Sequence, residues 1–261
     1  MILVDTHCHL NDEKIYPDRS LFVTKAMEAG LRFILCVGWD LESSKKAIQI
    51  AHEFPIVYAA VGIHPENLEG VSEEAIQEIK ELSKDEKVLA IGEIGLDYHW
   101  FKKAEERELQ KKWFIRQIDL ANEVGLPISI HAREAAEDAL SILKEHKPIN
   151  GAVLHCYSGS TETLKELSKL GFYFGFDGPI TYKNSIVPKS NVVACPFDRL
   201  LSETDSPYLS PEPYRGASNA PEHIKEIVNQ MAILRRIPFE EIASQIAENT
   251  KNIFHVELKN G

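Results

Sequence analysis

Eight short apolar segments, rich in β-branched residues, recur along the chain, and each is followed by a stretch long enough for a helix. This alternation predicts successive strand–helix units around a parallel sheet. Eight units favour a closed barrel over an open doubly wound sheet, and no glycine-rich phosphate-binding motif follows any predicted strand. We therefore expect one α/β domain over residues 1–261, a single (β/α)8 TIM barrel. The segments begin near Ile2, Arg32, Ile56, Val88, Pro127, Ala152, Phe172 and Arg199.

The segments between the predicted strands carry the signals of amphipathic helices. Gly30 and Gly125 stand where a glycine commonly ends a helix, and Ser72 precedes two acidic residues in the pattern of an N-cap. After the eighth strand we expect a long irregular loop over 206–221 and two helices, the second with Pro238 in its first turn. One predicted helix presents an apolar face formed by Leu109, Trp113, Ile118 and Ala121.

Composition excludes several classes of protein. The chain is 44% apolar and 26% charged, which is typical of a globular domain and not of a disordered chain. Its longest apolar run, Ile56 to Ile63, is far shorter than the roughly 18 residues needed to cross a bilayer. The start of the chain lacks the pattern of a secretory signal, so we expect a cytoplasmic protein without a membrane partner.

Cysteine spacing and net charge exclude further classes of protein. The four cysteines show no Cys-x-x-Cys spacing, which favours reduced, buried thiols and argues against zinc fingers. The net charge of −11 argues against a long electrostatic footprint on duplex DNA, although a small site with metal ions is compatible with it. The sequence leaves the oligomeric state open and is compatible with a monomer.

Polar residues gather where the predicted strands turn into the following loops, and in a (β/α)8 barrel these strand ends hold the active site. His7 and His9 are two residues apart, so in a strand both imidazoles point to one side and suit one metal ion. The alternative for each ring taken alone is a hydrogen-bonded histidine at the edge of the core. The full set is His7, His9, His64, Glu93, Asp97, His131, His155, Glu203 and Asp205.

Three acidic positions in this set are informative. Glu93 lies among apolar residues and glycines, where a carboxylate needs a cation; a metal ion is the economical partner and an arginine is the alternative. Glu203 and Asp205 also share one side, so that one can approach the attacking water while the other holds a ligand. The alternative for Asp205 is a helix N-cap, which Pro207 disfavours because the chain before a proline stays extended.

Four motifs occur in a fixed order along the chain: DTHCHL at 5–10, GEIGLDY at 92–98, HCYSG at 155–159 and ETDSPYL at 203–209, followed by Arg215, Gly216 and Asn219. Together they resemble the TatD family of metal-dependent hydrolases, over essentially the whole chain. The resemblance implies a TIM barrel related to the amidohydrolases. It also implies a deoxyribonuclease that hydrolyses phosphodiester bonds, usually as a 3′-to-5′ exonuclease on single-stranded DNA and sometimes on RNA.

The same resemblance implies two divalent metal ions near the strand ends, a bridging carboxylate and a catalytic base. Glu93 is the bridge, and Asp205 is both a ligand and the base for the attacking water, with Glu203 the next candidate for that base. Mixed imidazole and carboxylate ligands favour Zn²⁺ or Mn²⁺ over Mg²⁺. The other implied ligands are His7 and His9 on one ion and His131 and His155 on the other.

We expect phosphate or base contacts from His64, Tyr98, Arg133 and Arg215. Tyr98 and Trp100 are candidates for stacking on unpaired terminal bases, which favours the ends of single-stranded DNA as the nucleic-acid substrate. The chain departs from the family at two places near these residues. A second His is missing after the Gly-Ile-His64-Pro segment, and His99 stands where an aromatic residue is common.

Two other functions remain open. An amidohydrolase, lactonase or deacylase, for example an aminoacyl-tRNA deacylase, would use the same barrel and metals. Many such relatives bridge their metals with a carboxylated lysine where this chain has Glu93, which disfavours amide chemistry. A non-catalytic binding protein with a relic pocket would lack at least one ligand, and the sequence retains all of them.

Overall fold

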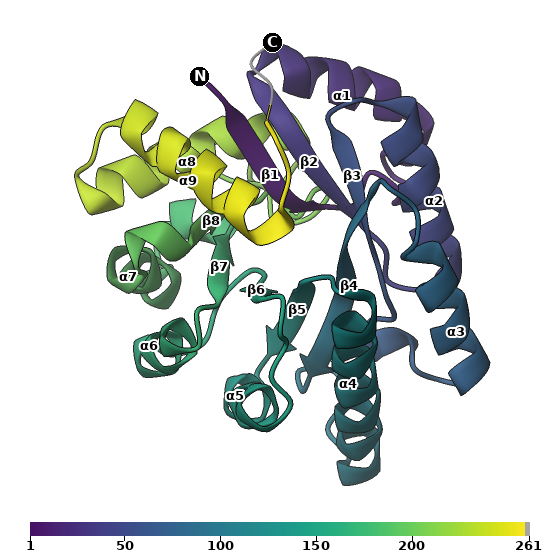
Figure 1. Cartoon of the computed structure of the whole chain (residues 1–261). Coiled ribbons are helices and arrows are strands. Elements are labelled where there is room, and N and C mark those ends of the chain that lie inside the picture. Colours follow the sequence, from purple (N-terminus) through teal and green to yellow (C-terminus); the bar gives the residue numbers. More distant parts are fainter. Residues whose placement is uncertain (259–261) are drawn as a thin grey trace.

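The eight predicted strands form one parallel sheet in the computed structural model, which describes residues 1–258. They follow one another around the sheet in sequence order, and helices alternate with them on the outside (Figure 1). Every predicted segment starts within one residue of an observed strand, which confirms the (β/α)8 barrel. The strands are β1 (Leu3–Cys8), β2 (Leu31–Val37), β3 (Val57–Val61), β4 (Val88–Asp97), β5 (Ile128–Arg133), β6 (Ala152–Leu154), β7 (Tyr173–Phe176) and β8 (Leu200–Ser202).

The helices form an outer ring, and two of them follow β8 as predicted (Figure 1). Within residues 1–258, no helix combines the length and the apolar character that a membrane crossing requires. The helices are α1 (Arg19–Glu28), α2 (Leu41–Glu53), α3 (Glu73–Leu82), α4 (Ala104–Val124), α5 (Ala136–Glu145), α6 (Thr161–Lys169), α7 (Ile186–Ala194), α8 (Ile224–Arg235) and α9 (Phe239–Phe254).

Helix ends and faces agree with the sequence in most details. Gly125 ends α4 with φ at 75°, a left-handed conformation that glycine adopts without steric cost. Two expectations are wrong. Pro238 lies just before α9 as its N-cap and not inside its first turn. Leu109 is 40% exposed, because α4 turns its apolar face toward the sheet through Trp113, Ile118 and Ala121.

The barrel closes between β8 and β1 through side chains. The Thr6 hydroxyl donates to the Ser202 carbonyl at 3.1 Å, and the Ser202 hydroxyl donates to the Val4 carbonyl at 2.9 Å. Beyond the strand end, the Asp205 amide donates to the His7 carbonyl at 2.9 Å. These bonds join the first and last strands and place the residues after β8 beside those of β1.

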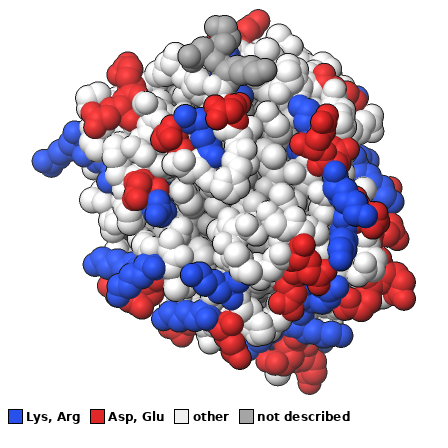
Figure 2. Space-filling view, viewed as in Figure 1, with Lys and Arg blue, Asp and Glu red and all other residues white. Residues whose placement is uncertain are grey.

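The core fills the barrel and the layer beneath the helices with apolar side chains. Phe33, Phe174 and Phe176 are among its largest fully buried members. All four cysteines are free thiols, and Cys8, Cys36 and Cys195 are buried, which agrees with the expectation from their spacing. In the face shown in Figure 2, charged side chains gather around the periphery, whereas the middle is largely uncharged.

Candidate metal centre

Histidines and carboxylates from six strands meet at the carboxyl ends of the barrel strands. Three groups of side chains have ligand atoms within 4.8 Å of one another: His7, Glu93 and His155; His7, His9 and Asp205; and His64, Glu93 and His131. The groups overlap, since Glu93 belongs to two of them and His7 to two. All of these residues except His7 line a cavity of about 610 Å³, a volume common for small-molecule sites.

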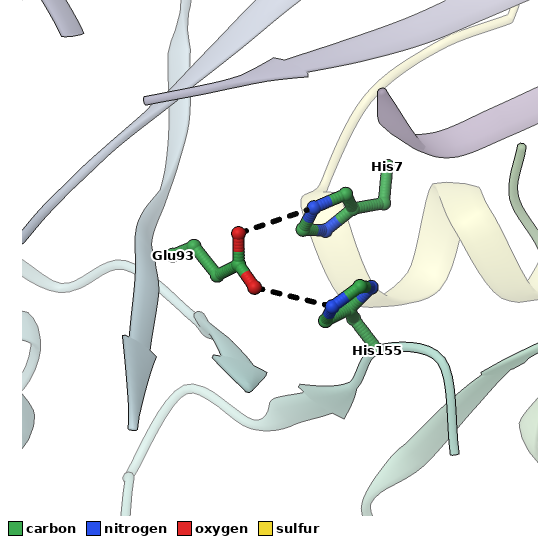
Figure 3. A group of neighbouring side chains, drawn as sticks. All are labelled: His7, Glu93 and His155. Atoms are coloured by element: carbon green, nitrogen blue, oxygen red, sulfur yellow. Dashed lines mark ion pairs between the residues drawn. The ribbon is translucent and has the colours of Figure 1, made fainter. Parts of the chain in front are cut away.

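Glu93 stands at the centre of the cluster, and its two carboxylate oxygens face different histidines. Oε2 lies 3.5 Å from Nε2 of His7 and 3.8 Å from Nε2 of His9. Oε1 lies 2.9 Å from Nδ1 of His131 and 3.1 Å from Nε2 of His155. Figure 3 shows one oxygen directed to His7 and the other to His155. This is the geometry of a carboxylate that can bridge two cations.

Asp205 completes the side of the cluster that contains His7 and His9. Its Oδ1 lies 3.4 Å from Nε2 of His9 and 3.8 Å from Nε2 of His7. The extended conformation expected before Pro207 is not found at Asp205, whose φ is +55°. This left-handed turn is held by the hydrogen bond from the Asp205 amide to the His7 carbonyl, and it directs the carboxylate into the cavity. Ligand atoms from three residues, His7, His9 and Asp205, thus lie within 4.8 Å of one another.

Backbone and side-chain partners orient the imidazoles. Nδ1 of His9 lies 3.0 Å from the Val37 carbonyl, and because a carbonyl only accepts, Nδ1 carries the proton and Nε2 offers its lone pair to the cluster. Nδ1 of His155 donates in the same way to Oε1 of Glu203 at 3.2 Å. Both rings therefore present Nε2 to the space around Glu93.

The structure places Glu203 behind the ring of His155. Its carboxylate is fully buried and also accepts a hydrogen bond from the amide of Cys156. Gly175 on β7 leaves room for it, since a Cβ at that position would collide with the carboxylate. Glu203 was the second candidate for the base, after Asp205, and its position behind His155 fits the other role expected for this pair, that of holding a ligand in place. It orients a candidate ligand, and Asp205 alone of the two lines the cavity.

His131 lies between two carboxylates. Its Nδ1 is 2.9 Å from Glu93 and its Nε2 is 2.9 Å from Oδ2 of Asp97, which ends β4. The other oxygen of Asp97 accepts from the amides of His99 and Trp100. Asp97 is fully buried, so it holds the ring of His131 from within the protein. His131 and His155 belong to different groups and share Glu93 as their common neighbour.

His64 is turned differently from the other histidines of the cluster. Its Nδ1 accepts a hydrogen bond from the Glu66 amide at 3.2 Å, so in the neutral ring the proton is on Nε2. That N–H points toward Oε1 of Glu93 at 3.5 Å. Burial lowers the pKa of His64, which keeps the ring neutral near pH 7. His64 is therefore arranged as a hydrogen-bond donor toward Glu93.

The electrostatics of the cluster fit divalent cations. Burial by itself raises the pKa of Glu93, but the surrounding imidazoles outweigh it and hold that pKa well below its usual range. The same balance lowers the pKa of Asp205, with His9 as the strongest opposing partner. Two anionic carboxylates thus lie among imidazole nitrogens, and Nδ1 of buried His7 has no hydrogen-bond partner. Imidazole and ionised carboxylate are the ligand types that Zn²⁺ and Mn²⁺ accept.

The four expected substrate contacts lie at very different depths. His64 and Arg133 line the cavity. Tyr98 is buried beside it, and its hydroxyl donates to Asp138 at 2.7 Å, so its expected role as a stacking platform is not supported by its position. Arg215 is exposed outside the cavity, with its guanidinium 4.2 Å from the ring of Tyr182. Trp100 is 63% exposed and does not line the cavity.

Residues after β2 and β7 were not singled out from the sequence. Trp39 follows β2 and lines the cavity, and Asp177 follows β7 as a buried carboxylate with one oxygen unpartnered. Both residues follow the end of a strand, and this position is the one sequence signal that could have identified them. Neither residue lies in a motif with a histidine. An isolated Trp or Asp at a strand end is also common in proteins that have no active site there.

Comparisons with known proteins agree with this geometry. Residues 4–255 match the family described as TatD related DNase. The chain is 44% identical over 256 residues to YabD of Bacillus subtilis, an uncharacterized metal-dependent hydrolase, covering 98% of this chain and 100% of that protein.

Comparison with solved structures gives the same family and fold. The crystal structure of YJJV, a TatD homolog from Escherichia coli, superposes with a TM-score of 0.91 at 30% identity, covering 98% of both chains. An amidohydrolase from Saccharomyces cerevisiae shares the fold at 18% identity, with a TM-score of 0.86 and coverage of 97% and 100%. The chain therefore belongs to the TatD family of metal-dependent hydrolases.

Proposed function

We propose that this protein is a deoxyribonuclease that uses two divalent metal ions to hydrolyse phosphodiester bonds at the 3′ ends of single-stranded DNA. One observation carries the two-ion part of the proposal: Oε2 of Glu93 faces His7 and His9, whereas Oε1 faces His131 and His155. His7, His9 and Asp205 would hold one ion with Oε2, and His131 and His155 the other with Oε1. Two ions bound there would supply Lewis-acid activation of water and of the phosphoryl group.

Asp205 is the residue placed to accept the proton of the attacking water. It lines the cavity, and the imidazoles beside it keep its pKa below the usual range, so it is ionised at neutral pH. Glu93 is also ionised but is enclosed by histidines on both sides. Since general-base catalysis requires a reachable, unprotonated group, Asp205 fits that role and Glu93 fits the role of a bridge.

Charge around the cavity supports a substrate with few phosphates in contact. Among the described residues that line it, Arg133 is the one Lys or Arg, whereas Asp12 and Glu66 stand at the same cavity. With a net charge of −11, the protein repels an extended polyanion outside the centre. A strand end, with one phosphate at the centre and one near Arg133, meets less repulsion than a phosphate in the middle of a long strand.

The direction of hydrolysis and the preference for DNA rest on the family resemblance, and the test must address them directly. Linear single-stranded DNA labelled at either end, its circular form and a blunt duplex are incubated with protein stripped by EDTA, with and without Mn²⁺, Zn²⁺ or Mg²⁺. We expect metal-dependent loss of nucleotides from the 3′ end of the linear strand alone. Rapid cutting of the circular strand, or turnover only of a parallel panel of amides, lactones and aminoacyl-tRNA, would contradict the proposal.

A further inference from the structure

Two aromatic side chains line the cavity on the side of His9. The ring of Trp39 lies 5.3 Å from the imidazole of His9 between centroids, at an angle of 72°. The ring of Tyr208 lies 6.2 Å from the same imidazole, at 70°. Both rings thus meet His9 edge-on. Within residues 1–258, no other aromatic ring stacks on Trp39 or Tyr208.

Both aromatic residues are held in place by the surrounding chain. The Trp39 amide donates to the Ser43 hydroxyl at 2.8 Å, and its carbonyl accepts from the His64 amide at 2.9 Å. The Tyr208 hydroxyl donates to Asp12 at 2.6 Å, and its carbonyl accepts from the Asn219 side chain at 2.7 Å. The backbone at both positions and the Tyr208 hydroxyl are therefore fixed, which lowers the conformational entropy that is lost when a ligand binds.

The surroundings of the pair are suited to a planar, uncharged group. Tyr208 is 42% exposed and carries the Lys14 ammonium 4.6 Å from its ring centroid. Asp12 lies at the same wall, so a phosphate there meets a carboxylate, and Arg133 lies elsewhere on the cavity as the single basic lining residue described. A nucleobase has an uncharged π-face that stacks on aromatic rings largely regardless of its identity.

We propose that Trp39 and Tyr208 form the subsite that receives an unpaired base next to the scissile phosphodiester, and that this pair selects single-stranded ends. The inference rests on the proposed function and adds the specificity determinant to it. Bases inside a duplex are stacked on their neighbours and hydrogen-bonded, so only an unpaired base can stack on this wall of the cavity. Tyr98 and Trp100, the aromatic residues favoured by the sequence, lie outside the cavity.

The test compares two single strands of equal length, one with ordinary 3′-terminal nucleotides and one with abasic residues at the last two positions. The measured quantity is kcat/KM for the ordinary strand divided by kcat/KM for the abasic strand. Since stacking on an aromatic residue is worth ~1–3 kcal/mol per base, Trp39→Ala should lower that ratio by roughly 5- to 150-fold, mainly through KM. Trp39→Phe, which retains a π-face, should keep most of the preference.

Ile149→Ala is the control, because it shortens an exposed apolar side chain that does not line the cavity, and we expect the wild-type ratio. If Trp39→Ala lowers kcat/KM equally for both strands, Trp39 only supports the ring of His9 and the inference is overturned. The inference also fails alone if the wild type cleaves both strands equally well. If the wild type cleaves neither strand with any metal, the proposed function fails and the subsite with it.

Discussion

The two ends of the barrel differ sharply in chemistry. At the amino ends, the strands begin with buried apolar residues such as Leu3, Leu31 and Ile128. At the carboxyl ends, the same strands lead into buried histidines and carboxylates, with Glu93 at their centre. Apolar burial stabilises the fold, whereas enclosing ionisable groups opposes it. The comparison teaches that stability and chemistry are assigned to opposite ends, as is usual for TIM-barrel enzymes.

The separation predicts that a change at the carboxyl end alters activity and leaves the fold intact. Asp205→Asn should lower kcat by about 10²–10⁴-fold, because the amide cannot accept the proton of the attacking water. Steady-state kinetics on the single-stranded substrate measure the effect, and thermal unfolding serves as the control. A rate near that of the wild type would remove Asp205 from the role of base.

A change at the amino end should have the opposite profile. Leu31→Ala, at the fully buried start of β2, should cost about 2–5 kcal/mol in the free energy of unfolding because it leaves a cavity in the core. Denaturant unfolding measures this cost, while kcat per folded molecule at low temperature should stay within a few-fold of the wild type. A large loss of kcat in the folded variant would show that the two ends are coupled.

A change at Asp97, which lies behind the candidate ligand His131, should have an intermediate effect on metal binding. Asp97→Asn weakens the hydrogen bond that holds His131, so metal affinity should fall by about 10–100-fold. Calorimetric titration of the stripped protein with Zn²⁺ measures this change, and Gln49→Ala on the exposed side of α2 is the control. Unchanged affinity would show that Glu93 alone suffices to orient His131.

The smallest effect is expected at the surface pair of Arg19 and Glu53. The hydrogen bond from Arg19 lowers the pKa of Glu53, so the pair stabilises the folded state above the ordinary pKa of a glutamate, and this is lost as pH falls through the lowered value. Glu53→Gln should therefore cost roughly 0.5 kcal/mol at pH 7, and this cost should shrink toward zero as the pH falls through the lowered pKa of Glu53. A cost that persists in acid would point to packing instead of charge.

Much of the site could be predicted because its ligands carry local signals. The pair His7 and His9 needs only the period of a strand to point both rings to one side. The acidic Glu93 among apolar residues signals a buried cation partner without knowledge of its neighbours. The family motifs then place five of the six expected ligands, His131 stands at the end of its own predicted strand, and the structure brings all six into the cluster.

Other roles could not be predicted, because they depend on partners distant in sequence. Glu203 and Asp205 are two residues apart, yet the turn at Asp205 sends one carboxylate into the cavity and leaves the other behind His155. Tyr98 belongs to a motif but is drawn to Asp138 on α5 and away from the substrate side. Spacing in the sequence predicts to which side of a strand a side chain points. It does not predict which partners the neighbouring strands and helices bring to that side chain.

By itself, the sequence determined the eight strand–helix units, their order and the end of the barrel at which the chemistry lies, because periodicity and strand-end position are local properties of the chain. Only the tertiary structure decided which imidazoles face each oxygen of Glu93 and which aromatic residues reach the cavity. Trp39 and Tyr208 lie more than a hundred residues apart and meet at His9 because β8 closes against β1. Such proximity results from closure of the barrel, which no segment of the chain encodes alone.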